Sequence, residues 1–185
     1  MRGSSDSEIE LLSAGRVRVP AYVGLGSNAG DRRAFLAFGL NALLNSRRVD
    51  LLGLSGIYET LPVGGPKQES YLNAVALLST TLDTRELLEL IAKAEDKAGR
   101  RRDAEERWGP RPLDIDILAH GDEVISTPEL TVPHPRMYER EFVLVPLFDV
   151  GLVAGTSIDF DRAEAALRKL RGAQGVVLVE PPDWL

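Results

Sequence analysis

Two aspartates carry the clearest chemistry in this 185-residue sequence. Asp114 and Asp116 stand in the stretch Leu-Asp-Ile-Asp-Ile-Leu at 113–118, whose apolar and acidic residues alternate as in a half-buried strand. Side chains two apart on a strand share a face, so the two carboxylates project side by side. A hard divalent cation relieves their repulsion, and Mg²⁺ commonly takes one or two carboxylates together with phosphate oxygens. The pair predicts a magnesium site that serves a phosphate compound, and a solvated acidic face is the alternative.

An arginine-rich segment leads into this strand. Residues 100–111 hold five arginines, namely Arg100, Arg101, Arg102, Arg107 and Arg111. Planar guanidinium groups grip phosphate in a bidentate way. The chain as a whole carries a net charge of −6, which argues against a general nucleic-acid binder and leaves a small polyanion as the better partner. Arg101 and Arg107 could equally be solvated loop charges.

Composition narrows the class of protein. The chain has no cysteine and two histidines, which excludes disulfides and cysteine nucleophiles and speaks against a multi-histidine metal site. No apolar run reaches the ~20 residues of a membrane span, and no signal peptide opens the sequence. We therefore expect a cytoplasmic protein with no membrane partner. Residues 1–17 are polar and serine-rich, so we expect a flexible tail followed by one domain over 18–185.

The periodicity of apolar residues predicts an α+β fold. Its core elements are a strand at 19–25, a helix at 32–45, strands at 51–60 and 71–81, a helix at 84–98 and the strand that carries the two aspartates. Asn28 or Asp31 would cap the first helix. This order of elements is the ferredoxin-like βαββαβ pattern with an antiparallel sheet. The C-terminal additions that we expect are a small hairpin starting near 124–125, an extended segment at 130–135, helices beginning at 136 and 161, and a strand at 176–179.

A glycine-rich turn admits another interpretation. Residues 24–29 satisfy the G-x-G-x-x-A fingerprint of dinucleotide-binding proteins. No acidic residue lies about 20 positions further on, where that fingerprint needs one for the ribose. The next two predicted strands are also joined by a loop too short for a parallel crossover. A nicotinamide-dependent oxidoreductase is therefore a minor alternative.

Four separated segments, in the same order, resemble the 6-hydroxymethyl-7,8-dihydropterin pyrophosphokinase family of folate biosynthesis. They are residues 25–28, 71–74, 107–117 and 130–134, and the likeness spans roughly 22–148. The resemblance implies that the chain transfers the diphosphate of ATP to the hydroxymethyl group of 6-hydroxymethyl-7,8-dihydropterin, leaving AMP. It also implies that Asp114 and Asp116 bind two Mg²⁺ ions, with ATP as co-substrate.

The resemblance assigns further residues to the two substrates. The catalytic set is Arg100, Arg111, Asp114 and Asp116. The ATP-binding set is Arg100, Arg102, Arg111, Ile117, Thr131, His134 and Arg140, and which loop arginine meets which phosphate stays open. The pterin-binding set is Thr60, Pro62, Val63, Gly64, Tyr71, Asn73, Trp108 and Phe142. In this set Tyr71 and Phe142 sandwich the pterin, the Asn73 amide donates and accepts at its edge, and Trp108 closes over the pocket.

Several points stay open at this level. Without the resemblance, Tyr71 and Phe142 would be assigned to the core and His134 to a structural role. No residue stands out as general base, and Asp116 is a candidate by proximity alone.

A non-catalytic ligand-binding module, such as a nucleotide sensor, is the alternative from another class, because this scaffold hosts many functions. An RNA-binding version would need adjacent aromatics on the sheet, whereas the aromatics here are few and lie near loops. For the oligomeric state, the sequence leaves a monomer and an oligomer as open alternatives.

Overall fold

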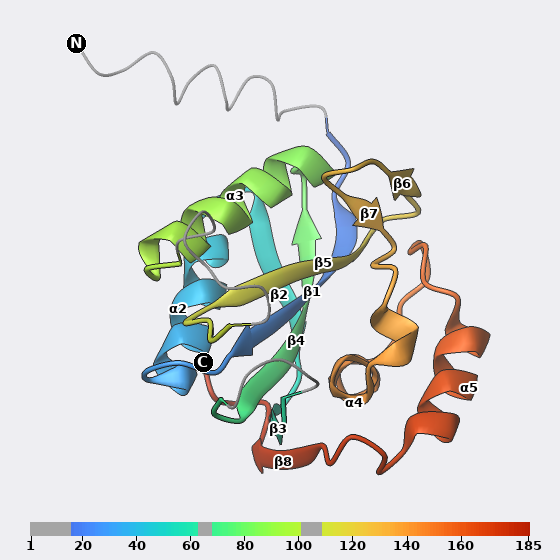
Figure 1. Ribbon diagram of the computed structural model, residues 1–185. Coiled ribbons are helices and arrows are strands. Elements are labelled where there is room, and N and C mark those ends of the chain that lie inside the picture. Colours follow the sequence, from blue (N-terminus) through green and yellow to red (C-terminus); the bar gives the residue numbers. More distant parts are fainter. Residues whose placement is uncertain (1–15, 63–67, 101–108) are drawn as a thin grey trace.

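A six-stranded antiparallel sheet forms the middle layer of the protein (Figure 1). The structure is a computed structural model and describes residues 16–62, 68–100 and 109–185. The strands of the sheet are β1 (Val19–Ser27), β2 (Val49–Leu54), β3 (Ile57–Thr60), β4 (Tyr71–Thr80), β5 (Asp114–His120) and β8 (Val177–Glu180). Their order is β5-β1-β4-β3-β8, and β2 also pairs with β4. The mixed α/β class and the antiparallel sheet predicted from the sequence are confirmed.

Helices cover both faces of this sheet. The first face packs on α2 (Arg32–Leu44) and α3 (Thr84–Lys97). The second face packs on α4 (Glu141–Val150), and α5 (Phe160–Leu170) packs on α4 and on the segment before it. Strand residues alternate between the two cores: Ala21 and Val23 belong to the first, whereas Tyr22 belongs to the second. Burial on both faces explains why β4 reads as an almost continuous apolar run.

Side-chain caps fix where the two long helices begin. The Asp31 carboxylate accepts a hydrogen bond from the backbone N–H of Ala34 at 3.0 Å and caps α2, so Asp31 rather than Asn28 is the cap. At α3, Asp83 and Glu86 form a reciprocal capping box. Short polar side chains at these two positions therefore end the preceding segments and start the helices.

The predicted strand at 51–60 is wrong in one respect, because the chain breaks it into β2 and β3. Between them, the Ser55 hydroxyl accepts a hydrogen bond from the Val75 N–H at 2.8 Å. A Cβ atom on Gly56 would lie 2.7 Å from the carbonyl oxygen of Glu180. The interruption thus accommodates the close approach of β8, which pairs with β3.

Of the C-terminal additions, the hairpin packs on the first core, whereas η1, α4 and α5 belong to the second. The expected hairpin forms from β6 (Ile125–Ser126) and β7 (Thr131–Val132). The helix expected from 136 begins instead as a 3₁₀ turn, η1 (Met137–Glu139), before α4 starts at Glu141. None of the helices in the described segments combines the length and apolarity needed to cross a membrane.

Candidate active site

The alternation predicted for β5 is confirmed. Leu113, Ile115 and Ile117 are at most 4% exposed and join the core, while Asp114 and Asp116 point to the opposite side. In the antiparallel register, Gly26 lies opposite Asp114 and Gly24 lies opposite Asp116. Both glycines line the same cavity as the two acids. These two glycines of β1 therefore leave the space beside the carboxylates free of side chains.

Asp114 is held by two arginines. Its Oδ1 lies 2.6 Å from Nη1 of Arg100, and its Oδ2 lies 2.9 Å from Nη1 of Arg111. The Arg100 side chain is only 8% exposed and also contacts Glu95, whose Oε1 lies 2.5 Å from the same Nη1. Glu95 Oε1 in turn accepts a hydrogen bond from the Ile115 N–H at 2.9 Å. The buried ion pairs of Arg100 with Glu95 and with Asp114 thus fix the position of the Asp114 carboxylate.

Sequence reasoning missed Glu95, although a signal was present. Glu95 follows Ile91 by one helical turn on the buried face of α3, and it is 1% exposed. A fully buried acid requires a partner, because an unpaired charge in the interior is strongly unfavourable. An acid on the apolar face of a helix therefore points to a cation nearby, here Arg100.

Asp116 faces a different pair of side chains. Its Oδ2 lies 3.6 Å from Nη1 of Arg140 and 3.8 Å from Nε2 of His134. Desolvation, followed by the negative charge of Asp114, raises the pKa of Asp116 to about 6. Desolvation, followed by the charges of Arg140 and Arg136, lowers the pKa of His134 to about 4. His134 is therefore neutral at neutral pH, and its Nδ1 accepts a hydrogen bond from the Arg136 N–H, which leaves the proton on Nε2.

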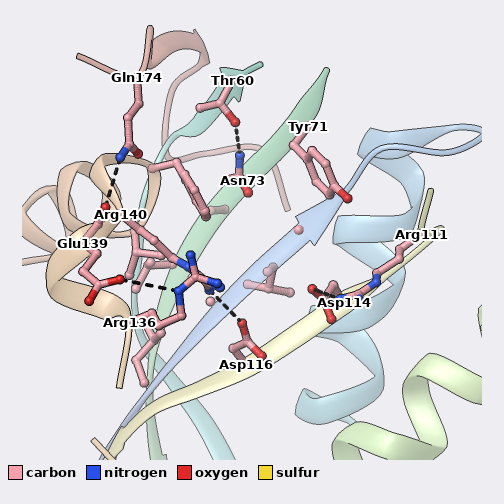
Figure 2. A pocket seen from close by; sticks show the side chains of 18 of the residues that line it. Thr60, Tyr71, Asn73, Arg111, Asp114, Asp116, Arg136, Glu139, Arg140 and Gln174 are labelled. Carbon is pink, nitrogen blue, oxygen red and sulfur yellow. Dashed lines mark hydrogen bonds and ion pairs between the residues drawn. The ribbon is translucent and has the colours of Figure 1, made fainter. Parts of the chain in front are cut away.

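The two acids lie where two cavities meet. The first cavity, of about 180 Å³, is lined by Thr60, Tyr71, Asn73, Arg140 and Phe142 among others (Figure 2). The second, of about 330 Å³, is lined by Arg100, Ile117, Thr131 and His134 among others. Arg111, Asp114 and Asp116 line both cavities. This arrangement suits transfer of a group between two ligands, one in each cavity.

The first cavity combines aromatic rings with an amide. The Asn73 Nδ2 atom donates to Thr60 Oγ1 at 2.8 Å, as Figure 2 shows. Asn73 is 7% exposed, and an amide group of this kind has a second proton and a carbonyl oxygen with which to bind a ligand. The guanidinium of Arg140 lies 5.6 Å from the centroid of the Phe142 ring. A flat, polar-edged aromatic molecule matches these groups.

Asn28 has a role that its sequence position did not predict. It is 1% exposed, its N–H donates to the Arg111 carbonyl at 3.0 Å, and its Oδ1 accepts from the Arg111 N–H at 2.8 Å. Its Nδ2 also donates to Oε1 of Gln68 at 2.8 Å. Asn28 therefore fixes the backbone of Arg111, three residues before Asp114.

Some predicted site residues lie outside the described residues. These are Val63, Gly64, Arg102 and Trp108, together with Arg101 and Arg107. Pro62 is described, and its neighbour Leu61 lines the first cavity. All other predicted site residues line one cavity or both.

The donor set of the site suits magnesium. In the segments that the structure describes, no three histidine, aspartate or glutamate side chains gather around one point. A closed structural zinc site normally needs four protein ligands. Magnesium is commonly held by one or two carboxylates, with phosphate oxygens and waters completing the shell. Asp114 and Asp116 fit that pattern.

Known proteins that are similar to this chain are pyrophosphokinases. The family model described as 7,8-dihydro-6-hydroxymethylpterin-pyrophosphokinase matches residues 22–151. A Bacillus subtilis protein named 2-amino-4-hydroxy-6-hydroxymethyldihydropteridine pyrophosphokinase is 48% identical over 130 residues, which cover 70% of this chain and 77% of that protein. A Haemophilus influenzae protein of the same name is 40% identical over 132 residues, covering 71% and 81%.

Solved structures support the fold. A crystal structure of Plasmodium falciparum HPPK-DHPS A437G with pteroate superposes with a TM-score of 0.60 at 14% identity. The match covers 89% of this chain and 46% of that one, so this chain spans about half of the larger protein. With a family model over most of the chain and a relative that is 48% identical, this chain belongs to the 7,8-dihydro-6-hydroxymethylpterin-pyrophosphokinase family.

Proposed function

We propose that this protein transfers the diphosphate of ATP to the hydroxymethyl group of 6-hydroxymethyl-7,8-dihydropterin, giving AMP and the pterin diphosphate used in folate synthesis. The observation that carries the proposal is the position of Asp114 and Asp116, which line both cavities of a family member. In the reaction, the hydroxymethyl oxygen bonds to the β-phosphorus and the bond from that phosphorus to the α,β-bridging oxygen breaks. AMP leaves with the bridging oxygen.

The second cavity is the ATP side of this proposal. Ile117, Thr131 and His134 border the nucleotide, and the arginines Arg100, Arg102, Arg111 and Arg140 meet its phosphates. Support comes from Arg100 and Arg111, whose guanidinium groups already lie against Asp114. Phosphate oxygens offer the same bidentate geometry as a carboxylate, so the arginines can shift to ATP without leaving the site.

Asp114 and Asp116 would hold two Mg²⁺ ions at the junction of the cavities. Paired magnesium ions neutralise phosphate charge and stabilise the attacking and leaving oxygens. The protein itself supplies positioning and fixed positive charge, which phosphoryl transfer mostly needs. The hydroxyl proton must also leave, and Asp116 is the candidate acceptor by proximity, because it lines the first cavity.

The first cavity is the pterin side. Tyr71 and Phe142 would stack on the two faces of the ring, while Asn73, oriented by Thr60, would bind its polar edge. Pro62, Val63, Gly64 and Trp108 complete the predicted pterin set.

We also propose the ferredoxin-like topology for the scaffold, as one domain over 18–185 of a cytoplasmic enzyme. If β2 and β3 count as one interrupted strand, the order of the four core strands is fourth, first, third, second. The two helices between them, α2 and α3, lie on one face, as the βαββαβ pattern requires. Both hydrophobic cores share the same sheet, which supports one domain.

Incubation with ATP, Mg²⁺ and 6-hydroxymethyl-7,8-dihydropterin tests the proposal. We expect AMP and pterin diphosphate in equal amounts, with no AMP when the pterin is omitted. Asp116→Asn serves as the matched control for a contaminating activity. Binding of both ligands without AMP release would instead favour a ligand-binding module. Binding of a nicotinamide cofactor without Mg²⁺ would favour an oxidoreductase, which the antiparallel neighbours of β1 already disfavour.

A further inference from the structure

Residues 172–174, which lie beyond the family match, form hydrogen bonds with the beginning of α4. Gln174 Nε2 donates to the Glu139 carbonyl at 3.0 Å, as Figure 2 shows, and Gln174 Oε1 accepts from the Glu141 N–H at 2.9 Å. In return, the Glu141 carboxylate accepts from the N–H groups of Gly172 and Gln174 at 2.5 and 2.8 Å. Four hydrogen bonds thus join residues 172–174 to residues 139–141, and Glu141 is only 3% exposed.

The two anchor points of the Gln174 amide bracket Arg140. Arg140 is the N-cap residue of α4, but its side chain makes no capping hydrogen bond. The guanidinium instead reaches towards Asp116, 3.6 Å away. The first N–H groups of a helix have no partner within the helix. A guanidinium has no acceptor atom, so Arg140 cannot cap these groups, and the Gln174 Oε1 atom accepts from the Glu141 N–H in its place.

The same two hydrogen bonds hold the backbone on either side of Arg140. Arg140 has extended backbone angles, φ −119° and ψ 104°, between the 3₁₀ turn η1 and the helix. Such a junction residue can rotate when its neighbours are free, and the hydrogen bonds to Glu139 and Glu141 fix both of its peptide groups. Gln174 itself lines the first cavity beside Arg140 and Phe142, so the constraint acts within the site.

We propose that Gln174 is a positioning residue for diphosphate transfer, which acts by holding Arg140 towards Asp116. This inference rests on the proposed function, because Arg140 matters to turnover only if the site handles ATP. It gives residues 172–174, outside the matched segment 22–151, a part in the reaction. If Gln174 had a purely structural role, its replacement would lower kcat/KM by the same factor whether or not Arg140 is present.

Gln174→Met tests the proposal, since methionine has a similar length but cannot make either hydrogen bond. Loss of two ordinary hydrogen bonds predicts a kcat/KM about tenfold below that of the unaltered protein. Arg171→Ala, an exposed change three residues earlier on the same segment, should leave kcat/KM unchanged. The decisive comparison is Gln174→Met in an Arg140→Ala background, where the further loss should be less than about twofold.

Two results would overturn the proposal. The first is a Gln174→Met variant with unaltered kcat/KM. The second is a loss in the Arg140→Ala background as large as in the unaltered protein, because the effect would then not act through Arg140. Failure of the proposed function shows itself separately, as an unaltered protein that releases no AMP. Amide exchange then decides whether the cap exists: faster exchange of the Glu141 N–H in Gln174→Met supports it, and unchanged exchange refutes it.

Discussion

Replacing Arg100 should destabilise the protein far more than replacing Arg111, although we assign both side chains to ATP. Arg100 is 8% exposed and lies between Glu95, 1% exposed, and Asp114, 24% exposed. Arg100→Met keeps most of the side-chain volume but removes the buried cation that contacts Glu95. The Arg111 side chain is 28% exposed, so water partly replaces it when it is removed. The two arginines therefore differ in what they contribute to folding.

The expected magnitudes follow from burial. Removing one partner of a buried ion pair costs about 3 to 5 kcal/mol, and we take about 3 because Asp114 keeps Arg111. For a domain of this size, 1 kcal/mol corresponds to about 2–4 °C in Tm. Arg100→Met should therefore melt about 6–12 °C below the unaltered protein. Arg111→Met should lose less than about 1 kcal/mol, which is below about 4 °C.

Thermal unfolding followed by circular dichroism measures these differences. A charge-balanced double variant, Glu95→Gln with Arg100→Met, is the internal control. The amide oxygen introduced by Glu95→Gln would still accept the hydrogen bond from the Ile115 N–H but would leave no uncompensated charge. We expect the double variant to recover at least about 1 kcal/mol of the loss. An Arg100→Met variant that melts within about 2 °C of the unaltered protein would refute the buried ion pairs of Arg100.

Three further outcomes follow from the site and the fold. Asp116→Asn should slow single-turnover AMP release at least about 100-fold yet melt no lower than the unaltered protein, because the raised pKa of Asp116 shows that its charged form is disfavoured. Tyr71→Ala should weaken pterin binding about tenfold in a fluorescence titration through loss of a stacking face, and unaltered pterin affinity would exclude Tyr71 from that role. Arg48 lowers the pKa of Glu86 to about 2, so the stability that this pair contributes is complete above about pH 4.5 and is lost as the pH falls towards 2. In urea unfolding, Glu86→Gln should lack about 1–2 kcal/mol of that acid-sensitive stability, after discounting for solvent screening, and identical pH profiles would contradict the assignment.

Local patterns predicted the parts of the site that depend on local geometry. The alternation at 113–117 determines which side chains of β5 face the core, so the sequence alone places Asp114 and Asp116 together. The short polar side chain of Asp31 starts α2 for an equally local reason. Both features depend on residues a few positions apart. The alternation is confirmed, and of the two predicted cap residues, Asn28 and Asp31, the structure shows Asp31.

The features that the sequence did not predict depend on distant segments. The interruption at Ser55 and Gly56 arises because β8, more than 100 residues later, comes close to Gly56. The ion pair of Glu95 with Arg100 and the hydrogen bonds of Gln174 to the start of α4 likewise form only once the chain has folded. The G-x-G-x-x-A turn was ambiguous for a similar reason, since only its antiparallel neighbours show that its glycines make room beside the acids.

The most direct test of the account counts metal ions. Mn²⁺ can replace Mg²⁺ in electron paramagnetic resonance titrations with α,β-methylene ATP, whose α–β linkage cannot be broken, and with the pterin. If Asp114 and Asp116 jointly hold the cations that bind ATP, the unaltered protein should bind two Mn²⁺ ions and the Asp114→Asn, Asp116→Asn double variant fewer. Equal numbers of bound ions in the two proteins would contradict the account.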